Sequence, residues 1–137
     1  MTKKILVVED SLLMQKILRA TLEAYRTHEM DTYFATDGHE GLVKLNEHPD
    51  TDLILLDVNM PNMSGLEFLR QVRNQPPFDD IIVVLQSTEN HQEDIDRGLE
   101  AGAADYLAKP FTPTQLHDLL DELFAGASRG EPSEGQS

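Results

Sequence analysis

Three uninterrupted runs of aliphatic residues constrain the fold of this chain more than any other feature. They span Ile5–Val8, Leu53–Leu56 and Ile81–Leu85. A strand that is covered on both faces appears as a continuous apolar run rather than an alternating one, because each face packs against other elements. Two segments that are mixed in composition or shorter, Thr32–Thr36 and Tyr106–Ala108, have the character of edge strands. The chain is therefore predicted to form five strands, with the aliphatic runs at the centre of the sheet.

Segments with the periodicity of amphipathic helices lie between and after these strands. Helix start signals support them, because Ser64 precedes Glu67, and Asn90 precedes Glu93, at the spacing of a capping box. Thr112 is followed by a proline at the first helical position. The residues expected to face the core are Met14, Ile17, Leu18, Leu22 and Tyr25 in the first helix, and Leu116, Leu119, Leu120, Leu123 and Phe124 in the last.

Strands that alternate with helices predict an α/β fold in which a parallel sheet lies between two layers of helices. Right-handed crossover connections leave few topologies for such a chain. The expected domain covers residues 1–125, a length typical of one domain. Residues 126–137 contain no aliphatic side chain beyond one alanine, so we expect a disordered tail there.

The composition argues against several classes of function. The chain carries 25 acidic against 11 basic residues, a net charge of −14, so neither nucleic acid nor an anionic membrane surface is expected to bind it. It has no cysteine, which excludes disulfides, thiolate catalysis and cysteine-ligated metals. Its apolar runs are too short to span a membrane, and its first residues lack a secretory signal. We therefore expect a cytoplasmic protein.

Polar residues follow four of the five predicted strands, as Glu9–Asp10, Asp57–Asn59, Ser87–Thr88 and Lys109–Pro110. An acidic residue after a strand is often only a helix cap, but in an open parallel sheet these four ends meet at the edge where ligands bind. Crowded carboxylates need a cation, and oxygen ligands favour a hard ion such as Mg²⁺ or Mn²⁺. A carboxylate, a metal, a lysine and a hydroxyl together are typical of phosphoryl transfer.

This set of residues resembles that of the receiver domain of two-component response regulators. The most specific stretches are Leu55–Pro61 and Gly102–Phe111, which carry Asp57 and Lys109, and the resemblance covers about residues 3–125. It implies a doubly wound, flavodoxin-like (βα)5 fold with the strand order 2-1-3-4-5.

The resemblance also implies a role for each residue of the site. Asp57 would accept the phosphoryl group. Asp10 and Asp57 would bind Mg²⁺ or Mn²⁺ directly, joined by the backbone carbonyl of Asn59, and Glu9 would act through a water. Lys109 would pair first with Asp57 and then with the phosphoryl oxygens.

Other positions would form the switch. The hydroxyl of Ser87 would move to bond the phosphoryl group, and Tyr106 would turn inward as Ser87 moves. The bond between Lys109 and Pro110 would be cis, a form that only proline adopts at low cost.

Two positions depart from the family pattern. Thr88 stands where the family has alanine or glycine, so it is expected to narrow access to the phosphoryl group and to slow transfer. Ser64 replaces the usual acid before Gly65 and is interpreted as a helix cap. Asn59 and Glu89 occupy the positions that tune self-dephosphorylation, and this pair predicts a short-lived signal.

The expected function is a phosphorylation-activated switch that catalyses only its own phosphorylation and dephosphorylation. It would take phosphate from a sensor histidine kinase, a histidine phosphotransfer protein or a small donor, and it would act as a monomer or a phosphorylation-dependent dimer. It would control a protein partner through the surface of the fourth helix, fifth strand and fifth helix.

Two versions of this function remain open: a phosphorelay intermediate that passes phosphate to a histidine phosphotransfer protein, and a receiver from a longer DNA-binding or enzymatic regulator. A phosphohydrolase of the haloacid dehalogenase type is disfavoured, because no segment is long enough to form a cap over the substrate. A flavin or dinucleotide module is disfavoured because the loop after the first strand has no glycine.

Overall fold

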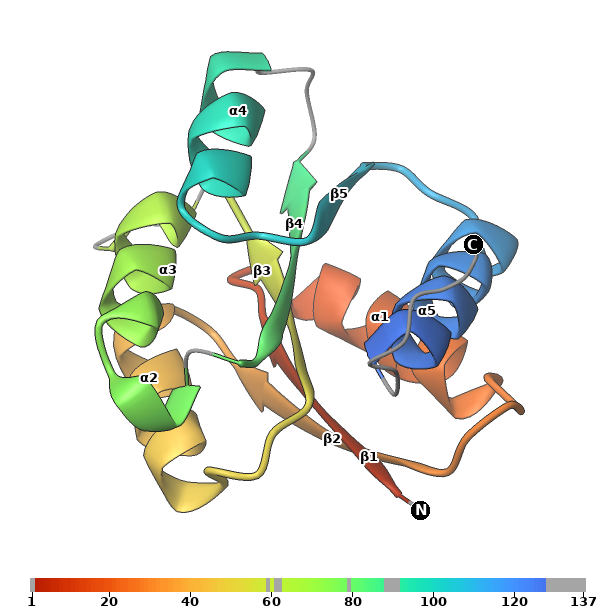
Figure 1. Cartoon of the computed structure of the whole chain (residues 1–137). Coiled ribbons are helices and arrows are strands. Elements are labelled where there is room, and N and C mark those ends of the chain that lie inside the picture. The colour runs from red at the N-terminus through yellow and green to blue at the C-terminus, as the bar shows by residue number, and fades with distance from the viewer. Residues whose placement is uncertain (1, 59, 61–62, 79, 88–91, 128–137) are drawn as a thin grey trace.

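The structure, a computed structural model, describes residues 2–58, 60, 63–78, 80–87 and 92–127. Strands and helices alternate along the chain, as the sequence predicted (Figure 1). Their bounds are β1 (Lys3–Val8), α1 (Leu12–Glu23), β2 (Met30–Ala35), α2 (Gly38–Glu47), β3 (Leu53–Asp57), α3 (Gly65–Arg73), a short 3₁₀ helix (Pro76–Phe78), β4 (Ile82–Ser87), α4 (Gln92–Glu100), β5 (Asp105–Ala108) and α5 (Pro113–Ala127).

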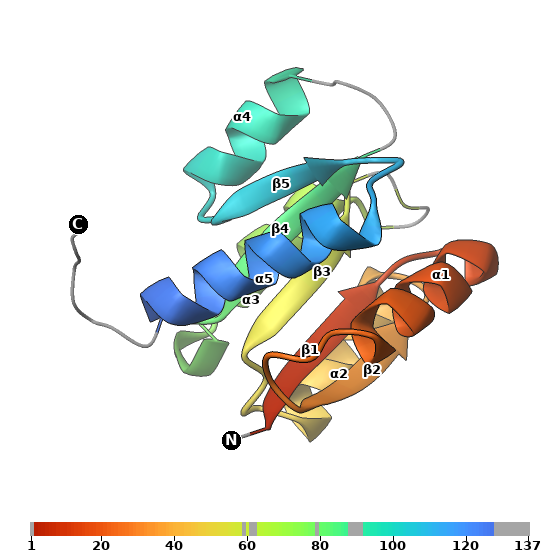
Figure 2. The same ribbon diagram turned by 90° about the vertical axis from the view of Figure 1, so that its right-hand side faces the viewer.

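The sheet is parallel throughout, and its strand order is β2-β1-β3-β4-β5. The doubly wound flavodoxin-like fold that the sequence predicted is therefore confirmed. Helices α1 and α5 cover one face of the sheet, and α2, α3 and α4 cover the other (Figures 1 and 2). The three aliphatic runs form the central strands, and the two mixed segments lie at the edges.

The core has one apolar cluster on each face of the sheet. Side chains alternate between them along each strand, so Ile5 and Val7 pack under α1 and α5 while Leu6 and Val8 pack under the other helices. This burial on both sides explains why the central strands are continuously aliphatic. At about 25 cal/mol per Å² of apolar surface, such burial dominates the stability of the fold.

The predicted helix starts agree with the structure wherever it describes them. The hydroxyl of Ser64 accepts the backbone N–H of Glu67 at 3.1 Å. Thr112 and Gln115 cap each other reciprocally, because each side chain accepts the backbone N–H of the other residue at 2.8–3.1 Å. Asn90, the other predicted cap, lies outside the described residues.

One predicted core residue of α1 was wrong. Ile17 is 47% exposed, and Met14 is half-buried. Leu18, Leu22 and Tyr25 are buried as expected, although α1 ends at Glu23, before Tyr25. The buried face of α1 is completed instead by Thr21, and Ile17 lies beside it at an open groove shared with Phe111. The α5 face matches the prediction, apart from Leu123, which is half-buried.

Helix α5 continues to Ala127, two residues past the expected boundary at residue 125. Residues 128–137 lie outside the described part of the chain. Among the described residues, no helix combines the length and the apolar character needed to cross a membrane.

Candidate functional site

Four strands bring polar side chains to the C-terminal edge of the sheet. Glu9 and Asp10 follow β1, Asp57 ends β3, Ser87 ends β4 and Lys109 follows β5. Glu9, Asp57 and Ser87 are buried, whereas Asp10 is exposed. The parallel sheet therefore assembles the residues that were predicted from the strand ends.

Three carboxylates meet at this edge. One oxygen from each of Glu9, Asp10 and Asp57 lies within 4.8 Å of the others. Negative charges this close repel one another unless a cation lies between them. Because all the side-chain donors are oxygens, the cluster fits a hard divalent ion such as Mg²⁺ or Mn²⁺.

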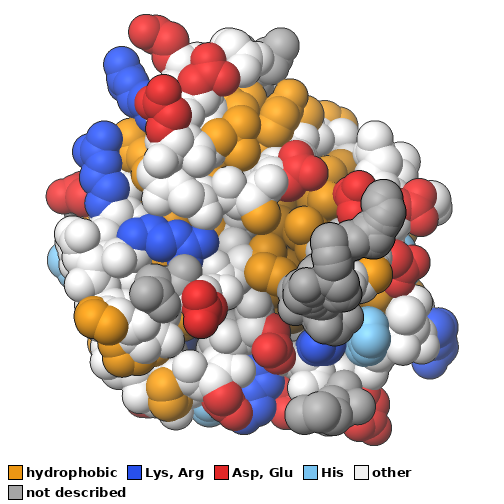
Figure 3. All heavy atoms as spheres, viewed as in Figure 1, with side chains coloured by type: hydrophobic (Ala, Val, Ile, Leu, Met, Phe, Trp, Pro, Cys, Tyr) orange, Lys and Arg blue, Asp and Glu red, His pale blue; other side chains and the backbone are white. Residues whose placement is uncertain are grey.

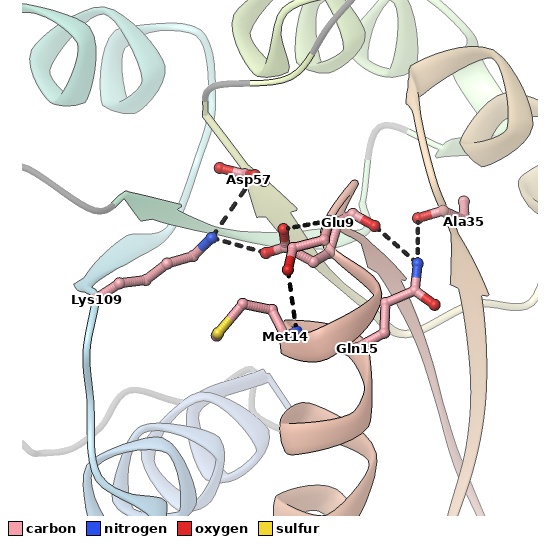
Figure 4. Close-up of polar contacts among 7 residues, drawn as sticks. Glu9, Met14, Gln15, Ala35, Asp57 and Lys109 are labelled. Atoms are coloured by element: carbon pink, nitrogen blue, oxygen red, sulfur yellow. Dashed lines mark hydrogen bonds and ion pairs between the residues drawn. The ribbon is translucent and has the colours of Figure 1, made fainter.

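A buried lysine partly offsets the charge of the cluster. The Nζ atom of Lys109 donates a hydrogen bond to Oε1 of Glu9 at 2.7 Å and lies 3.6 Å from Oδ2 of Asp57 (Figure 4). The Lys109 side chain is only 7% exposed, so both interactions are weakly screened by water. The shorter contact is with Glu9, a pairing that the sequence did not predict.

Glu9 is fixed from several directions. Its Oε2 accepts the backbone N–H of Ser11 at 3.0 Å, and its backbone carbonyl accepts the side-chain amide of Gln15 at 2.7 Å. Ser11 also caps α1, because its side-chain oxygen accepts the backbone N–H of Met14 at 3.2 Å. Both carboxylate oxygens of Glu9 thus accept hydrogen bonds from protein donors, whereas Asp10 is exposed.

A glycine lets the backbone of α3 approach Asp57 closely. A Cβ atom on Gly65 would collide with the carbonyl oxygen of Asp57 and would lie 2.9 Å from the Cα of Val58. The N–H of Gly65 donates to the carbonyl of Val58 at 3.1 Å, and the N–H of Val58 donates to the carbonyl of Gln86 on β4 at 2.9 Å. These bonds set the path of the chain as it leaves β3.

Ser87 and Lys109 are linked through the backbone. The N–H of Lys109 donates to the carbonyl of Ser87 at 2.6 Å, and Ser87 is paired with Ala108 in the ladder between β4 and β5. The end of β4 and the lysine of the site therefore belong to one hydrogen-bonded unit.

Comparison with known proteins identifies the family. The family model of the response regulator receiver domain matches residues 5–121. This chain belongs to the response regulator receiver family. It is 34% identical, over 93% of its length and 96% of the relative's, to a chemotaxis protein CheY homolog of Campylobacter jejuni.

Solved structures of receivers superpose on this one. The chemotaxis response regulator CheY4 of Vibrio cholerae has a TM-score of 0.79 and 34% identity, and the match covers 90% of this receiver and 99% of CheY4. The receiver domain of the sensor histidine kinase PA1611 from Pseudomonas aeruginosa has a TM-score of 0.79 and 28% identity, over 91% of this receiver and 99% of that domain. That domain holds a magnesium ion in its active-site cleft.

The structure describes some of the other predicted positions of the receiver and not the rest. The peptide bond between Lys109 and Pro110 is cis, as predicted. Tyr106 lies on β5, half-buried, and packs against the cluster on the face covered by α2, α3 and α4. Asn59, Thr88 and Glu89 lie outside the described residues.

Two glutamines near the site of this receiver were not among the residues predicted from the sequence. Gln15 also donates to the carbonyl of Ala35 on β2, at 3.4 Å, and so joins the start of α1 to two strands. Gln86 is fully buried on β4, paired with Asp57 in the ladder, and neither polar atom of its side chain has a hydrogen-bond partner among the described residues. The only signal for Gln86 was an amide that interrupts an otherwise aliphatic strand.

Proposed function

We propose that this receiver is a phosphorylation-activated switch in which Asp57 accepts a phosphoryl group from a histidine of a sensor kinase or of a phosphotransfer protein. One observation carries the proposal. Asp57 is buried, belongs to a cluster of three carboxylates suited to a divalent cation, and lies 3.6 Å from the ammonium of Lys109. Few other reactions need a carboxylate nucleophile flanked by two positive charges.

Mg²⁺ or Mn²⁺ is the expected cofactor. Asp10 and Asp57 are proposed to bind the ion directly, because Asp10 is exposed and both share the cluster. Glu9 is proposed to act through a water, because both of its carboxylate oxygens already accept protein hydrogen bonds. The family pattern adds the backbone carbonyl of Asn59. When bound, the ion would offset negative charge on the transferring phosphoryl group.

The proposed transfer exchanges one bond to phosphorus for another. One oxygen of Asp57 forms a bond to phosphorus while the bond from phosphorus to the donor's imidazole nitrogen breaks, and its electron pair stays on that nitrogen. Lys109, 3.6 Å from Asp57, neutralises charge on the phosphoryl oxygens. Ser87 donates its hydroxyl to the same group, which draws the end of β4 toward the site.

An apolar surface beside the site suits the docking of a phosphodonor. A groove of about 460 Å³ between α1 and the start of α5 is lined by Ile17, Lys109 and Phe111, among others. Leu12 and Leu13, on the same helix, are 65% and 69% exposed. Exposed apolar side chains that adjoin one another mark interaction sites, and a donor seated here would lie next to Lys109.

Phosphorylation is proposed to act on a protein partner through the surface of α4, β5 and α5. Tyr106 lies on β5, paired with Leu85 of β4 in the ladder. Ser87 lies two residues further along β4, so a movement of Ser87 would shift the surroundings of Tyr106. Similarity to chemotaxis receivers over nearly the whole of their length favours control of a target over a relay role.

Intact mass spectrometry after incubation with acetyl phosphate and Mg²⁺ tests the proposal. We expect one phosphoryl adduct, which is absent with EDTA and in the Asp57→Ala variant. The decay of the adduct after removal of the donor also measures the signal lifetime that Asn59 and Glu89 predict. An adduct that persists in Asp57→Ala, or no stabilisation by beryllofluoride in the unmodified protein, would contradict the proposed acceptor.

A further inference from the structure

A side-chain amide is buried at the end of β4, next to the candidate site. Gln86 is 0% exposed, and neither its Nε2 nor its Oε1 has a hydrogen-bond partner among the described residues. The charged side chains that Figure 3 shows on one face of the molecule lie at the surface, where water can hydrogen-bond to them. Gln86 has no such access to water. Because buried polar groups are nearly always hydrogen-bonded, an unpaired amide at this position requires an explanation.

Gln86 shares a face of the sheet with the proposed phosphoryl acceptor. Side chains alternate along a strand, and Leu55 of β3 and Val84 of β4 both pack under α1 and α5. Asp57 and Gln86 follow these two residues by two positions, so both project from the same face. The ladder pairs Asp57 directly with Gln86. The buried amide is therefore the neighbour of the acceptor carboxylate on β4.

The lysine of the site passes over the same end of β4. Strand β4 lies between β3 and β5 in the sheet. Lys109 follows β5, yet its Nζ lies 3.6 Å from Asp57 at the end of β3 (Figure 4). Its side chain therefore crosses the end of β4, and it lines a groove together with Met14 and Ile17 of α1, on the face from which Gln86 projects. The amide thus lies near both the acceptor and the lysine that pairs with it.

The amide and the carboxylate are within hydrogen-bonding reach. Neighbouring strands lie about 4.8 Å apart. A glutamine carries its amide on a flexible chain of methylene groups, so rotation of the Gln86 side chain can bring Nε2 to an oxygen of Asp57 without any movement of the backbone. The N–H of the amide is a donor, and both oxygens of a carboxylate are acceptors.

Phosphorylation would change what surrounds Asp57. One of its oxygens would carry the phosphoryl group, and Lys109 would turn to the phosphoryl oxygens, as in the proposed function. The other oxygen of Asp57 would then be an uncharged carbonyl that no longer faces the ammonium. A neutral amide is a suitable donor to such a carbonyl, and Gln86 holds one on the neighbouring strand.

We propose that Gln86 is a positioning residue of the phosphorylated site, whose side-chain N–H donates to the oxygen of Asp57 that does not carry phosphorus. This inference rests on the proposed function and adds one residue to its site. The amide is unpaired before transfer and bonded after it, so Gln86 favours the phosphorylated state over the unphosphorylated one. A hydrogen bond in this buried setting is only weakly weakened by water.

Gln86→Met tests the role of the amide, because methionine has a similar length and flexibility but no amide. The dissociation constant of beryllofluoride in the presence of Mg²⁺ is measured by NMR titration for the unmodified protein and the variant. We expect Gln86→Met to bind beryllofluoride about tenfold more weakly, because an amide that was unpaired gains its bond in the complex. The control is Gln92→Met at an exposed position of α4, which should bind within about twofold of the unmodified protein.

The side-chain amide resonances of Gln86 report on the bond itself. In ¹H–¹⁵N spectra they are the pair that is missing from Gln86→Met. On addition of beryllofluoride and Mg²⁺, we expect one of the two amide protons to shift downfield more than any other side-chain amide proton, since that proton becomes a donor. A Gln86 pair that does not move would overturn the proposal, as would equal affinity for beryllofluoride in Gln86→Met and the unmodified protein.

Urea denaturation separates this role from a purely structural one. In EDTA, Gln86→Met should be more stable than the unmodified protein, and with beryllofluoride and Mg²⁺ this gain should shrink or reverse. A gain that is the same in both conditions would mean that the amide only disturbs the core, and would refute the proposal.

Intact mass after incubation with acetyl phosphate separates this inference from the proposed function. An adduct at Asp57 in a protein whose beryllofluoride affinity is unaffected by Gln86→Met would refute the role of Gln86 alone. An unmodified protein that forms no adduct and binds no beryllofluoride would overturn both.

Discussion

At the scale of single residues, the acceptor site depends on a glycine as much as on its charged groups. We expect Gly65→Ala to lower the free energy of unfolding by about 1–3 kcal/mol, because the new methyl group forces the start of α3 away from the backbone of Asp57. The same shift should slow phosphorylation by acetyl phosphate. Urea denaturation and the rate of adduct formation measure the two effects.

Val43→Ala is the control for Gly65→Ala, because Val43 is 54% exposed on α2 and its truncation should change stability by less than about 0.5 kcal/mol. If Gly65→Ala were as stable and as quickly phosphorylated as the unmodified protein, the close approach of α3 would not shape the site.

At the scale of secondary-structure elements, β4 carries a buried side-chain amide, that of Gln86, which has no hydrogen-bond partner among the described residues. We expect Gln86→Leu to raise the free energy of unfolding by about 1–2 kcal/mol, because a buried polar group without a hydrogen bond costs that much relative to an apolar side chain of similar size. Gln92→Leu, at an exposed position on α4, should give no such gain. A loss of stability in Gln86→Leu would mean that the amide has a partner in the folded protein.

A tyrosine just after the end of α1 bonds to α5 and makes the stability of the fold depend on pH. Tyr25 donates its hydroxyl to Asp121 at 2.7 Å, and burial, reinforced by this hydrogen bond, raises the pKa of Tyr25 to about 12. The folded protein thus favours the protonated phenol. The contribution of Tyr25 to the free energy of unfolding is complete below pH 10, the pKa of tyrosine in the unfolded chain, and is lost as the pH rises to about 12.

Denaturation between pH 8 and pH 12 tests this link. The stability difference between the unmodified protein and Tyr25→Phe should be constant up to about pH 10 and should shrink above it. The same hydrogen bond lowers the pKa of Asp121, so the difference should also shrink in acid, as Asp121 becomes protonated. A difference that stays constant from pH 8 to pH 12 would contradict the bond between Tyr25 and Asp121.

The elements also show what the sequence reveals and what it does not. Local patterns predict the strands, the caps at Ser64 and Thr112, and the acidic strand ends. A strand buried on both faces is a continuous aliphatic run, and a helix cap lies within one turn of the residues it bonds, so both can be recognised in a short segment. The exposure of Ile17 depends on where α5 begins relative to α1, which no local pattern fixes. The pairing of Lys109 with Glu9 likewise arises only when residues 100 positions apart meet.

At the scale of the whole molecule, like charges repel one another at the edge of the sheet that carries the site. Lys109 provides one positive charge for three carboxylates, within a chain whose net charge is −14. Repulsion of this kind destabilises the metal-free fold. The same repulsion raises the affinity of the site for a divalent cation. Because the cation binds only the folded protein, its binding raises the free energy of unfolding.

Asp10→Asn should therefore change stability in opposite directions with and without metal. In EDTA the variant should melt at a higher temperature than the unmodified protein, because one of the three crowded charges is gone. In Mg²⁺ the unmodified protein should melt at the higher temperature. A ligand present at 100 times its dissociation constant adds about 2.7 kcal/mol to the free energy of unfolding of a protein that binds it. Glu47→Gln removes one charge from an exposed position of α2 and should leave the effect of Mg²⁺ intact. Melting curves of the three proteins in both conditions decide the matter: an Mg²⁺ shift that survives in Asp10→Asn would place the cation elsewhere.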